Sequence, residues 1–231
     1  MRAILLANGA GDRWDAQGEA FLKQQIPIDG VTVIGRTIRM LIELGLVHSE
    51  ILVVGPEALW AGSGVVGWQP PKRALDEPQP LLAGLLATKL LWDLHRTLIL
   101  LGDVVFSYKA LRLLIESKEP IQFLGREGGN PVIDKAANEL FGFVMAVDYR
   151  DCVASHCWDM SKRGAHINYP PKLWALYRLI CGFEHDEYKY EDELLLDPED
   201  YTDDVDSPQE YAHYWEYLKR AALEDLHASD R

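Results

Sequence analysis

The chain has 231 residues, of which 48% are hydrophobic, so it can bury the core of one large domain and is not predicted to be disordered. Its 36 acidic residues outnumber its 23 basic residues, and the net charge of −13 argues against a nucleic-acid partner, because the phosphate backbone is also negative. Three cysteines do not suggest a disulfide framework and no apolar run reaches 18 residues, so we expect a cytoplasmic protein with no membrane partner.

The beginning of the chain has the pattern of a strand, a helix and a second strand. Apolar runs at 2–7 and 50–55 predict buried strands. Between them, residues 33–45 have apolar side chains every three or four positions, which predicts a helix that ends at Gly45. This order favours a parallel sheet.

The same alternation continues toward the C-terminus. Strands are predicted at 65–68, 97–101, 121–124 and 140–147, and helices at 81–94, 108–116, 151–162 and 172–181. Ser107 is a candidate N-cap, and Ser207, Pro208 and Glu210 have the order of a capping box that begins a final helix. Because no repeat or flexible linker interrupts the chain, a single domain over 1–231 is predicted.

A glycine-rich loop follows the first strand, where the apolar run stops at Asn8-Gly9-Ala10-Gly11-Asp12-Arg13. Glycines let a ligand approach the main chain closely, and free N–H groups beside an arginine suit a polyphosphate. An ordinary turn is an equal alternative, and the third glycine of a dinucleotide fingerprint is missing.

Three other features suit a phosphate and metal site. Lys23 could neutralise a polyphosphate, although most lysines are simply exposed. Asp103 follows a buried strand and one glycine, where ligands of open α/β sheets bind, but it could instead be a turn or cap residue. The carboxylates of Asp203, Asp204 and Asp206 repel one another unless a cation binds, and the alternative is a solvated acidic loop.

Together and in this order, the motifs resemble the nucleotidyltransferase superfamily of nucleotide-sugar pyrophosphorylases and cytidylyltransferases. The superfamily sequence Leu-Ala-Ala-Gly-x-Gly-x-Arg corresponds to residues 6–13, with Asn8 in place of a small residue. Its Leu-x-Gly-Asp element corresponds to 100–103, and its Asp-Ile-Asp-Thr-Pro-Glu-Asp element is similar to 204–210.

This resemblance covers residues 2–125 and 202–215, and it implies a fold and a reaction. The fold is a three-layer α/β/α sandwich of Rossmann-like type with a mainly parallel, mixed sheet. Residues 1–125 would form a nucleotide-binding half, and 126–231 an acceptor-binding half with the C-terminal helix. The reaction is transfer of NMP from an NTP to a sugar phosphate or a small phosphorylated alcohol, with release of pyrophosphate and with Mg²⁺ or Mn²⁺ as cofactor.

The resemblance also suggests roles for individual residues. The nucleotide would be bound by Ala7, Asn8, Gly9, Ala10, Gly11, Gln79 and Gly84. Arg13 and Lys23 would be catalytic by stabilising negative charge, and Asp103 and Asp206 would hold the metal, with Asp204 as an alternative ligand. Groups available to bind the acceptor phosphate are Arg126, Asn130 and Lys135, for which solvation at the surface is the alternative.

Two other functions deserve comparison with this one. A glycosyltransferase of GT-A type that uses a nucleotide sugar has an Asp-x-Asp motif after a strand, and Asp103 is followed by Val104-Val105 instead. A non-catalytic nucleotide-binding regulator would not need both Asp103 and Asp206.

Two further groups of residues suggest a site or an interface. A zinc site is suggested by Cys152, His156, Cys157 and His166, but their spacing does not fit the usual pairs, and core or surface cysteines are the simpler prediction. The last helix carries Tyr211, Tyr214, Trp215 and Tyr217. These aromatics could form a homodimer face, although packing on the chain's own sheet is the simpler prediction.

Overall fold

The computed structural model describes residues 1–8, 22–28, 30–71, 80–92, 96–130, 138–163, 173–185, 187, 189, 191 and 193–229, and the statements below concern this part of the chain. Its main sheet has seven strands in the order β10-β8-β9-β6-β1-β4-β5. The strands are β1 (Arg2–Leu6), β4 (Ile51–Val54), β5 (Val66–Trp68), β6 (Thr97–Leu101), β8 (Ile121–Arg126), β9 (Glu139–Met145) and β10 (Leu195–Leu196). Strand β9 is antiparallel to both neighbours, and the other pairs are parallel.

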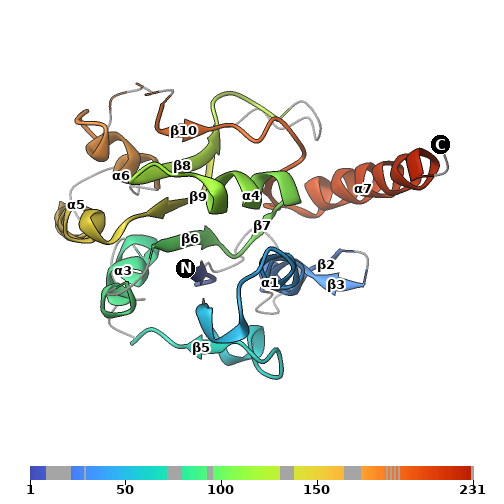
Figure 1. Ribbon diagram of the computed structural model, residues 1–231, viewed down its shortest axis with the longest axis horizontal. Helices are drawn as coiled ribbons and strands as arrows, with labels where there is room; N and C mark the ends of the chain where they lie inside the picture. The colour runs from blue at the N-terminus through green and yellow to red at the C-terminus, as the bar shows by residue number, and fades with distance from the viewer. Residues whose placement is uncertain are drawn as a thin grey trace.

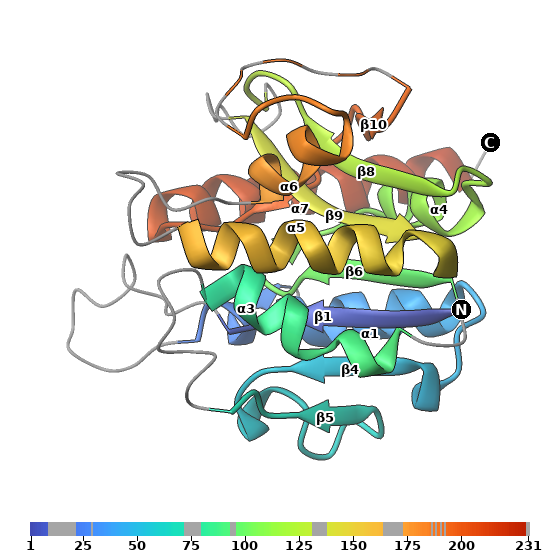
Figure 2. The ribbon, with the colours of Figure 1, turned by 90° about the vertical axis from the view of Figure 1, so that its left-hand side faces the viewer.

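Helices cover both faces of this sheet, as Figures 1 and 2 show. One face carries α1 (Val33–Glu43) and α4 (Tyr108–Glu116), and the other carries α3 (Pro80–Ala87), α5 (Arg150–Arg163) and α6 (Leu173–Ile180). Side chains alternate along β1, so that Ile4 packs in the core below α3 and α5, and Leu5 packs in the core below α1 and α4. The predicted three-layer α/β/α sandwich with a mixed, mainly parallel sheet is confirmed.

Most predicted elements lie within a residue or two of their expected bounds, and the helix predicted at 81–94 is the main exception. It ends at Ala87, and a short 3-10 helix, Lys89–Leu91, follows. The Thr88 hydroxyl donates to the Leu85 carbonyl at 2.7 Å and accepts from Trp92 Nε1 at 2.9 Å. The helix therefore ends earlier than predicted, and the chain after it buries the Trp92 ring in the core.

Two small sheets lie beside the main one. One is a hairpin of β2 (Pro27–Ile28) and β3 (Val31–Thr32), and the other pairs β7 (Val104–Val105) with β11 (Asp203–Asp204), which are almost a hundred residues apart in sequence. Both contribute to a third apolar cluster, made of Ile26, Ile28, Val33, Val105, Val205 and Tyr214.

The final helix, α7 (Pro208–Ser229), begins at this third cluster and extends to the right of the molecule in Figure 1. Tyr214 is completely buried there, and Tyr211 and Leu218 pack against the same cluster. The part of this helix whose side chains are described therefore packs within the chain, on an apolar cluster to which both small sheets contribute. No helix among the described residues has the length and apolar character needed to cross a membrane.

Candidate active site

Three of the residues singled out in the sequence meet at one place. Lys23 Nζ lies 3.5 Å from Asp103 Oδ2 and donates a hydrogen bond to Asp206 Oδ1. The side chains are 12%, 21% and 12% exposed, respectively, so this contact between one ammonium and two carboxylates is largely shielded from solvent. Residues 183 positions apart in sequence are thus in direct contact.

Asp103 is positioned by a tight turn between β6 and β7. The N–H of Gly102 donates to the Leu6 carbonyl at 2.8 Å, so the turn closes directly against the end of β1. A Cβ atom at Gly102 would lie only 2.9 Å from the Cβ of Ala7. A glycine before Asp103 is therefore needed for the carboxylate to reach the carboxyl end of the sheet, where ligands of open α/β sheets bind.

Asp206 is brought to Asp103 by the small sheet. In the antiparallel pair, Asp204 lies opposite Val104 and Asp203 opposite Val105. The register continues to a contact of 3.4 Å between the Val205 N–H and the Asp103 carbonyl. Because Asp206 comes next in sequence, the β7–β11 pairing places its carboxylate beside that of Asp103.

The beginning of α7 fixes Asp206 from the other side. Ser207 caps the helix, because its hydroxyl accepts from the Glu210 N–H at 3.2 Å. The Glu210 carboxylate accepts from the Asp206 N–H at 2.8 Å. The predicted capping box is thus present with one change, since Glu210 reaches the residue before the cap.

The charge of Lys23 is maintained by its partners. Burial by itself lowers the pKa of this lysine, but attraction to Asp103, the hydrogen bond to Asp206 and the negative charges of Asp206 and Asp204 outweigh that effect. The pKa of Lys23 is therefore raised above its ordinary value of 10.5, and the residue is a fixed cation at neutral pH.

The donor set of this cluster suits a hard divalent cation. Asp103 and Asp206 present only carboxylate oxygens toward one positive charge. Within the described ranges, no three His, Cys, Asp or Glu side chains gather to form a complete metal cage. Mg²⁺ is commonly bound by one or two carboxylates, with waters and substrate phosphates as the other ligands, so the residues present fit it.

Asn8 lies at the end of β1, next to α3. Its Oδ1 atom is buried, with no hydrogen-bond partner among the described residues. A Cβ at Gly84 would lie 2.5 Å from Asn8 Nδ2, so the amide lies directly against Gly84. The Ala7 N–H donates to the Val54 carbonyl at 2.8 Å, as part of the sheet. The structure thus brings Asn8 and Gly84 together and leaves one buried acceptor, of the kind that a ligand donor would satisfy.

Other predicted site residues lie outside the described part of the chain. These are Gly9, Ala10, Gly11, Arg13, Gln79 and Lys135, and their roles stay predictions.

Arg126 and Asn130 make contacts that the sequence did not suggest. Both side chains are buried. Asn130 Nδ2 donates to Asp203 Oδ2 at 3.0 Å, and Arg126 Nη2 donates to the Asp200 carbonyl at 2.7 Å. Surface solvation, the alternative considered for both residues, is wrong. Their prediction as acceptor-binding residues stays a prediction, since these contacts are within the chain. The signal for such a role in the sequence was a charged residue close to the end of the predicted strand 121–124.

The cysteine and histidine group does not form a metal site in the part of the chain that the structure describes, which excludes His166. Cys157 is buried in the core and Cys152 is exposed. Burial raises the pKa of the Cys157 thiol to about 12, which disfavours the thiolate that zinc requires. The simpler prediction, of one core and one surface cysteine, holds for this pair.

Comparisons with known proteins agree with this geometry at the level of the fold. No family profile and no curated protein matches the sequence. Among solved structures, the inositol-1-phosphate CTP transferase from T. maritima is 16% identical, with 94% of each chain covered and a TM-score of 0.63. The CTP:phosphocholine cytidylyltransferase from Streptococcus pneumoniae is 16% identical, with 94% of this chain and 98% of that chain covered and a TM-score of 0.62.

A third similar structure, from Bacillus anthracis, is described as a glucose-1-phosphate thymidylyltransferase. It is 14% identical, with 93% of this chain and 94% of that chain covered and a TM-score of 0.65. Identities this low establish a shared architecture but not a shared substrate. The chain thus has the same fold as these three structures, and this is the fold that the resemblance in its sequence motifs implies.

Proposed function

We propose that this protein is a nucleotidyltransferase that transfers NMP from an NTP to a small phosphorylated acceptor and releases pyrophosphate. The observation that carries the proposal is the meeting of Lys23, Asp103 and Asp206 at the carboxyl end of the sheet. Similar structures carry the names of transferases for glucose 1-phosphate, inositol 1-phosphate and phosphocholine. The acceptor class proposed here is accordingly a sugar phosphate or a phosphorylated alcohol.

The reaction needs positioning and charge neutralisation more than a protein nucleophile. An oxygen of the acceptor phosphate, already an anion, attacks the α-phosphorus of the NTP, and the bond between that phosphorus and the bridging oxygen to the β-phosphate breaks. Pyrophosphate leaves with that oxygen. Lys23 supplies a fixed positive charge next to the phosphates, which is worth most in a shielded site.

Asp103 and Asp206 would hold Mg²⁺ or Mn²⁺, with Asp204 as the alternative ligand. When bound, the metal would neutralise charge on the triphosphate and on the leaving pyrophosphate. The two carboxylates would then share their negative charge between the metal and Lys23, which contacts both of them.

The nucleotide would lie over the end of β1. The buried Asn8 Oδ1, which has no partner among the described residues, would accept a hydrogen bond from the base. Gly84, which leaves room for the Asn8 amide, would line the same place. The phosphates would be contacted by the loop residues Gly9, Ala10, Gly11 and Arg13. Gln79 would bind the base, and Ala7 would also line the nucleotide site.

The test is pyrophosphate release from a panel of NTPs and phosphorylated acceptors in the presence of Mg²⁺. We expect release with at least one pair, and we expect Asp103→Asn and Asp206→Asn to lower kcat/KM for that pair by about 100-fold or more. Asp151→Asn is the matched control, because Asp151 is an exposed residue of α5 that pairs with Lys89.

Two outcomes would contradict the proposal. One is a folded, Mg²⁺-loaded protein that releases no pyrophosphate with any pair. The other is an Asp103→Asn variant that turns over as fast as the Asp151→Asn control.

A further inference from the structure

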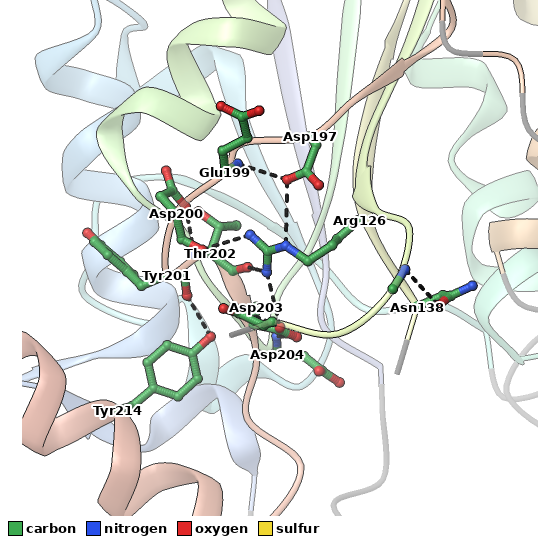
Figure 3. Close-up of polar contacts among 12 residues, drawn as sticks. Arg126, Asn138, Asp197, Glu199, Asp200, Tyr201, Thr202, Asp203, Asp204 and Tyr214 are labelled. Atoms are coloured by element: carbon green, nitrogen blue, oxygen red, sulfur yellow. Dashed lines mark hydrogen bonds and ion pairs between the residues drawn. The ribbon is translucent and has the colours of Figure 1, made fainter. Parts of the chain in front are cut away.

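Arg126, the last residue of β8, holds the acidic segment 197–204 against the main sheet. The residue is 4% exposed. Its Nη2 donates to the Asp200 carbonyl at 2.7 Å, and its Nη1 donates to the Thr202 carbonyl at 3.2 Å. The same guanidinium forms ion pairs with Asp203 Oδ2 and Asp197 Oδ1, both at 3.5 Å (Figure 3). A single side chain therefore binds the segment at four points.

Residues from other elements fasten the same segment. The Ser107 N–H, at the start of α4, donates to the Thr202 hydroxyl at 3.0 Å, and the Ser107 hydroxyl donates to Asp200 Oδ2 at 2.5 Å. From α7, the Tyr214 hydroxyl donates to the Tyr201 carbonyl at 2.8 Å (Figure 3). The segment that leads into β11 is thus fixed from three directions, and Arg126 is its cationic anchor.

The charge of the segment explains why an arginine is needed at this point. Asp197, Glu199, Asp200, Asp203 and Asp204 lie within eight positions and repel one another. Asp203 is completely buried, and a buried carboxylate needs a partner. The planar guanidinium has five N–H donors in a fixed fork and can reach two main-chain carbonyls and two carboxylates at once, whereas a lysine ammonium has only three donors on one atom.

The path from this anchor to the candidate active site is short. Asp203 and Asp204 form β11, whose pairing with β7 determines where the chain goes next. Asp206 follows two residues later and accepts the hydrogen bond from Lys23. Displacing the segment would move Asp206 away from Asp103 and Lys23, although none of these three residues would itself be substituted.

We propose that Arg126 is a positioning residue for the active site, because it holds the segment 197–204 in the register that places Asp206 beside Asp103 and Lys23. That this place is a metal site rests on the proposed function, whereas the positioning itself rests on contacts within the chain. A residue that merely stabilised the fold would leave Lys23 and Asp206 paired in every molecule that is folded.

The experiment compares Arg126→Lys and Arg126→Met in the full chain, at a temperature well below the unfolding transition of each variant. The first readout is the rate at which an acylating reagent modifies Lys23 at one fixed pH, measured by mass spectrometry of peptides. Asp206→Asn is the reference for a Lys23 that has lost this partner. We expect both Arg126 variants to shift the Lys23 modification rate from the wild-type value toward that reference.

The second readout is binding of Mn²⁺ alone, measured by electron paramagnetic resonance of the free ion. We expect about tenfold or greater weakening in the Arg126 variants, the usual effect of losing a residue that orients metal ligands. Arg178→Lys is the matched control, because Arg178 donates to the His185 carbonyl at 3.1 Å from α6, on the far face of the sheet, and should change neither readout.

Arg126→Lys and one further variant, Asp197→Asn, keep the test decisive if Arg126→Met does not fold. Arg126→Lys retains a positive charge near Asp203. Asp197→Asn weakens one arm of the network at a residue that is 40% exposed, and should produce a smaller change in the same direction. Folded variants with wild-type Lys23 modification and wild-type Mn²⁺ affinity would overturn the proposal.

The positioning proposal and the proposed function fail separately. If the wild type releases no pyrophosphate but the Arg126 variants shift the Lys23 modification rate toward the Asp206→Asn reference, the positioning proposal stands and the proposed function fails. If the wild type is active and the variants leave Lys23 modification unchanged, the function stands and the positioning falls.

Discussion

At the scale of single residues, Lys23 balances two carboxylates that would otherwise repel each other. Its ammonium contacts both Asp103 and Asp206, and its pKa is raised by their charges despite burial. A bound divalent cation would relieve the same repulsion. Lys23 and a bound metal ion are therefore both expected to reduce the repulsion between Asp103 and Asp206. Thermal unfolding tests this without any measurement of turnover.

We predict that Lys23→Met lowers the unfolding temperature in the absence of Mg²⁺, because the two carboxylates are left close together. Mg²⁺ should then raise the unfolding temperature of the variant more than that of the wild type. Mg²⁺ at ten times its Kd stabilises a folded protein by about 1.4 kcal/mol, which for a chain of this size is a shift of about 3–6 °C. Differential scanning fluorimetry with and without Mg²⁺ measures both effects.

Lys89→Met is the control for this experiment, since Lys89 pairs with the exposed Asp151 at 2.9 Å, away from the site. Its unfolding temperature should respond to Mg²⁺ as the wild type does. An unfolding temperature of Lys23→Met that is unaffected by Mg²⁺ would contradict a metal at these carboxylates.

At the scale of elements, two glycines allow the end of β6 and the middle of α3 to lie close to the end of β1. A Cβ at Gly102 would meet the Ala7 Cβ at 2.9 Å and the Leu6 carbonyl oxygen at 3.1 Å, both of them fixed at the carboxyl end of the central strand β1. A Cβ at Gly84 would meet only the Asn8 amide, the far end of a side chain that can rotate. The two sites therefore differ in what a methyl group would displace.

We predict that Gly102→Ala lowers the free energy of unfolding by about 1–3 kcal/mol, the usual cost of overpacking. Gly84→Ala should leave stability nearly unchanged, because a helix propensity gain of about 1 kcal/mol offsets the movement of Asn8. Under the proposed function it should instead raise KM for the NTP. Urea unfolding and steady-state kinetics measure the two effects, and equal loss of stability in both variants would contradict this account.

At the scale of the whole molecule, the two predicted halves share one sheet. Strand β9, from the second half, lies between β8 and β6, and Thr97–Leu100 of the first half pair with Gly142–Met145. Trp92 of the first half and Trp174 of the second half belong to the same apolar cluster. A boundary near residue 125 therefore does not coincide with a break in the core.

We predict that residues 1–231 unfold in a single cooperative transition, as one domain. Urea curves followed by far-UV circular dichroism and by tryptophan fluorescence should have the same midpoint. Separate midpoints for the two probes would indicate that the halves unfold independently.

The sequence by itself determined the elements whose signals are local, and its motifs singled out three residues that lie together in the structure. The strand Thr97–Leu101 and the helix Tyr108–Glu116 begin and end where the sequence predicts, because an apolar run and the Ser107 cap define them. Lys23, Asp103 and Asp206 were identified from motifs, and the structure places them in contact.

Only the tertiary structure decided how these residues are held together. The β7–β11 pairing, the contacts of Arg126 with the segment 197–204 and the packing of α7 all join residues that are far apart in the sequence. Such contacts leave no periodic or local pattern, since each partner alone resembles an ordinary loop, strand end or helix. Their energy depends on burial, as with Arg126 and Asp203, and burial is a property of the assembled fold.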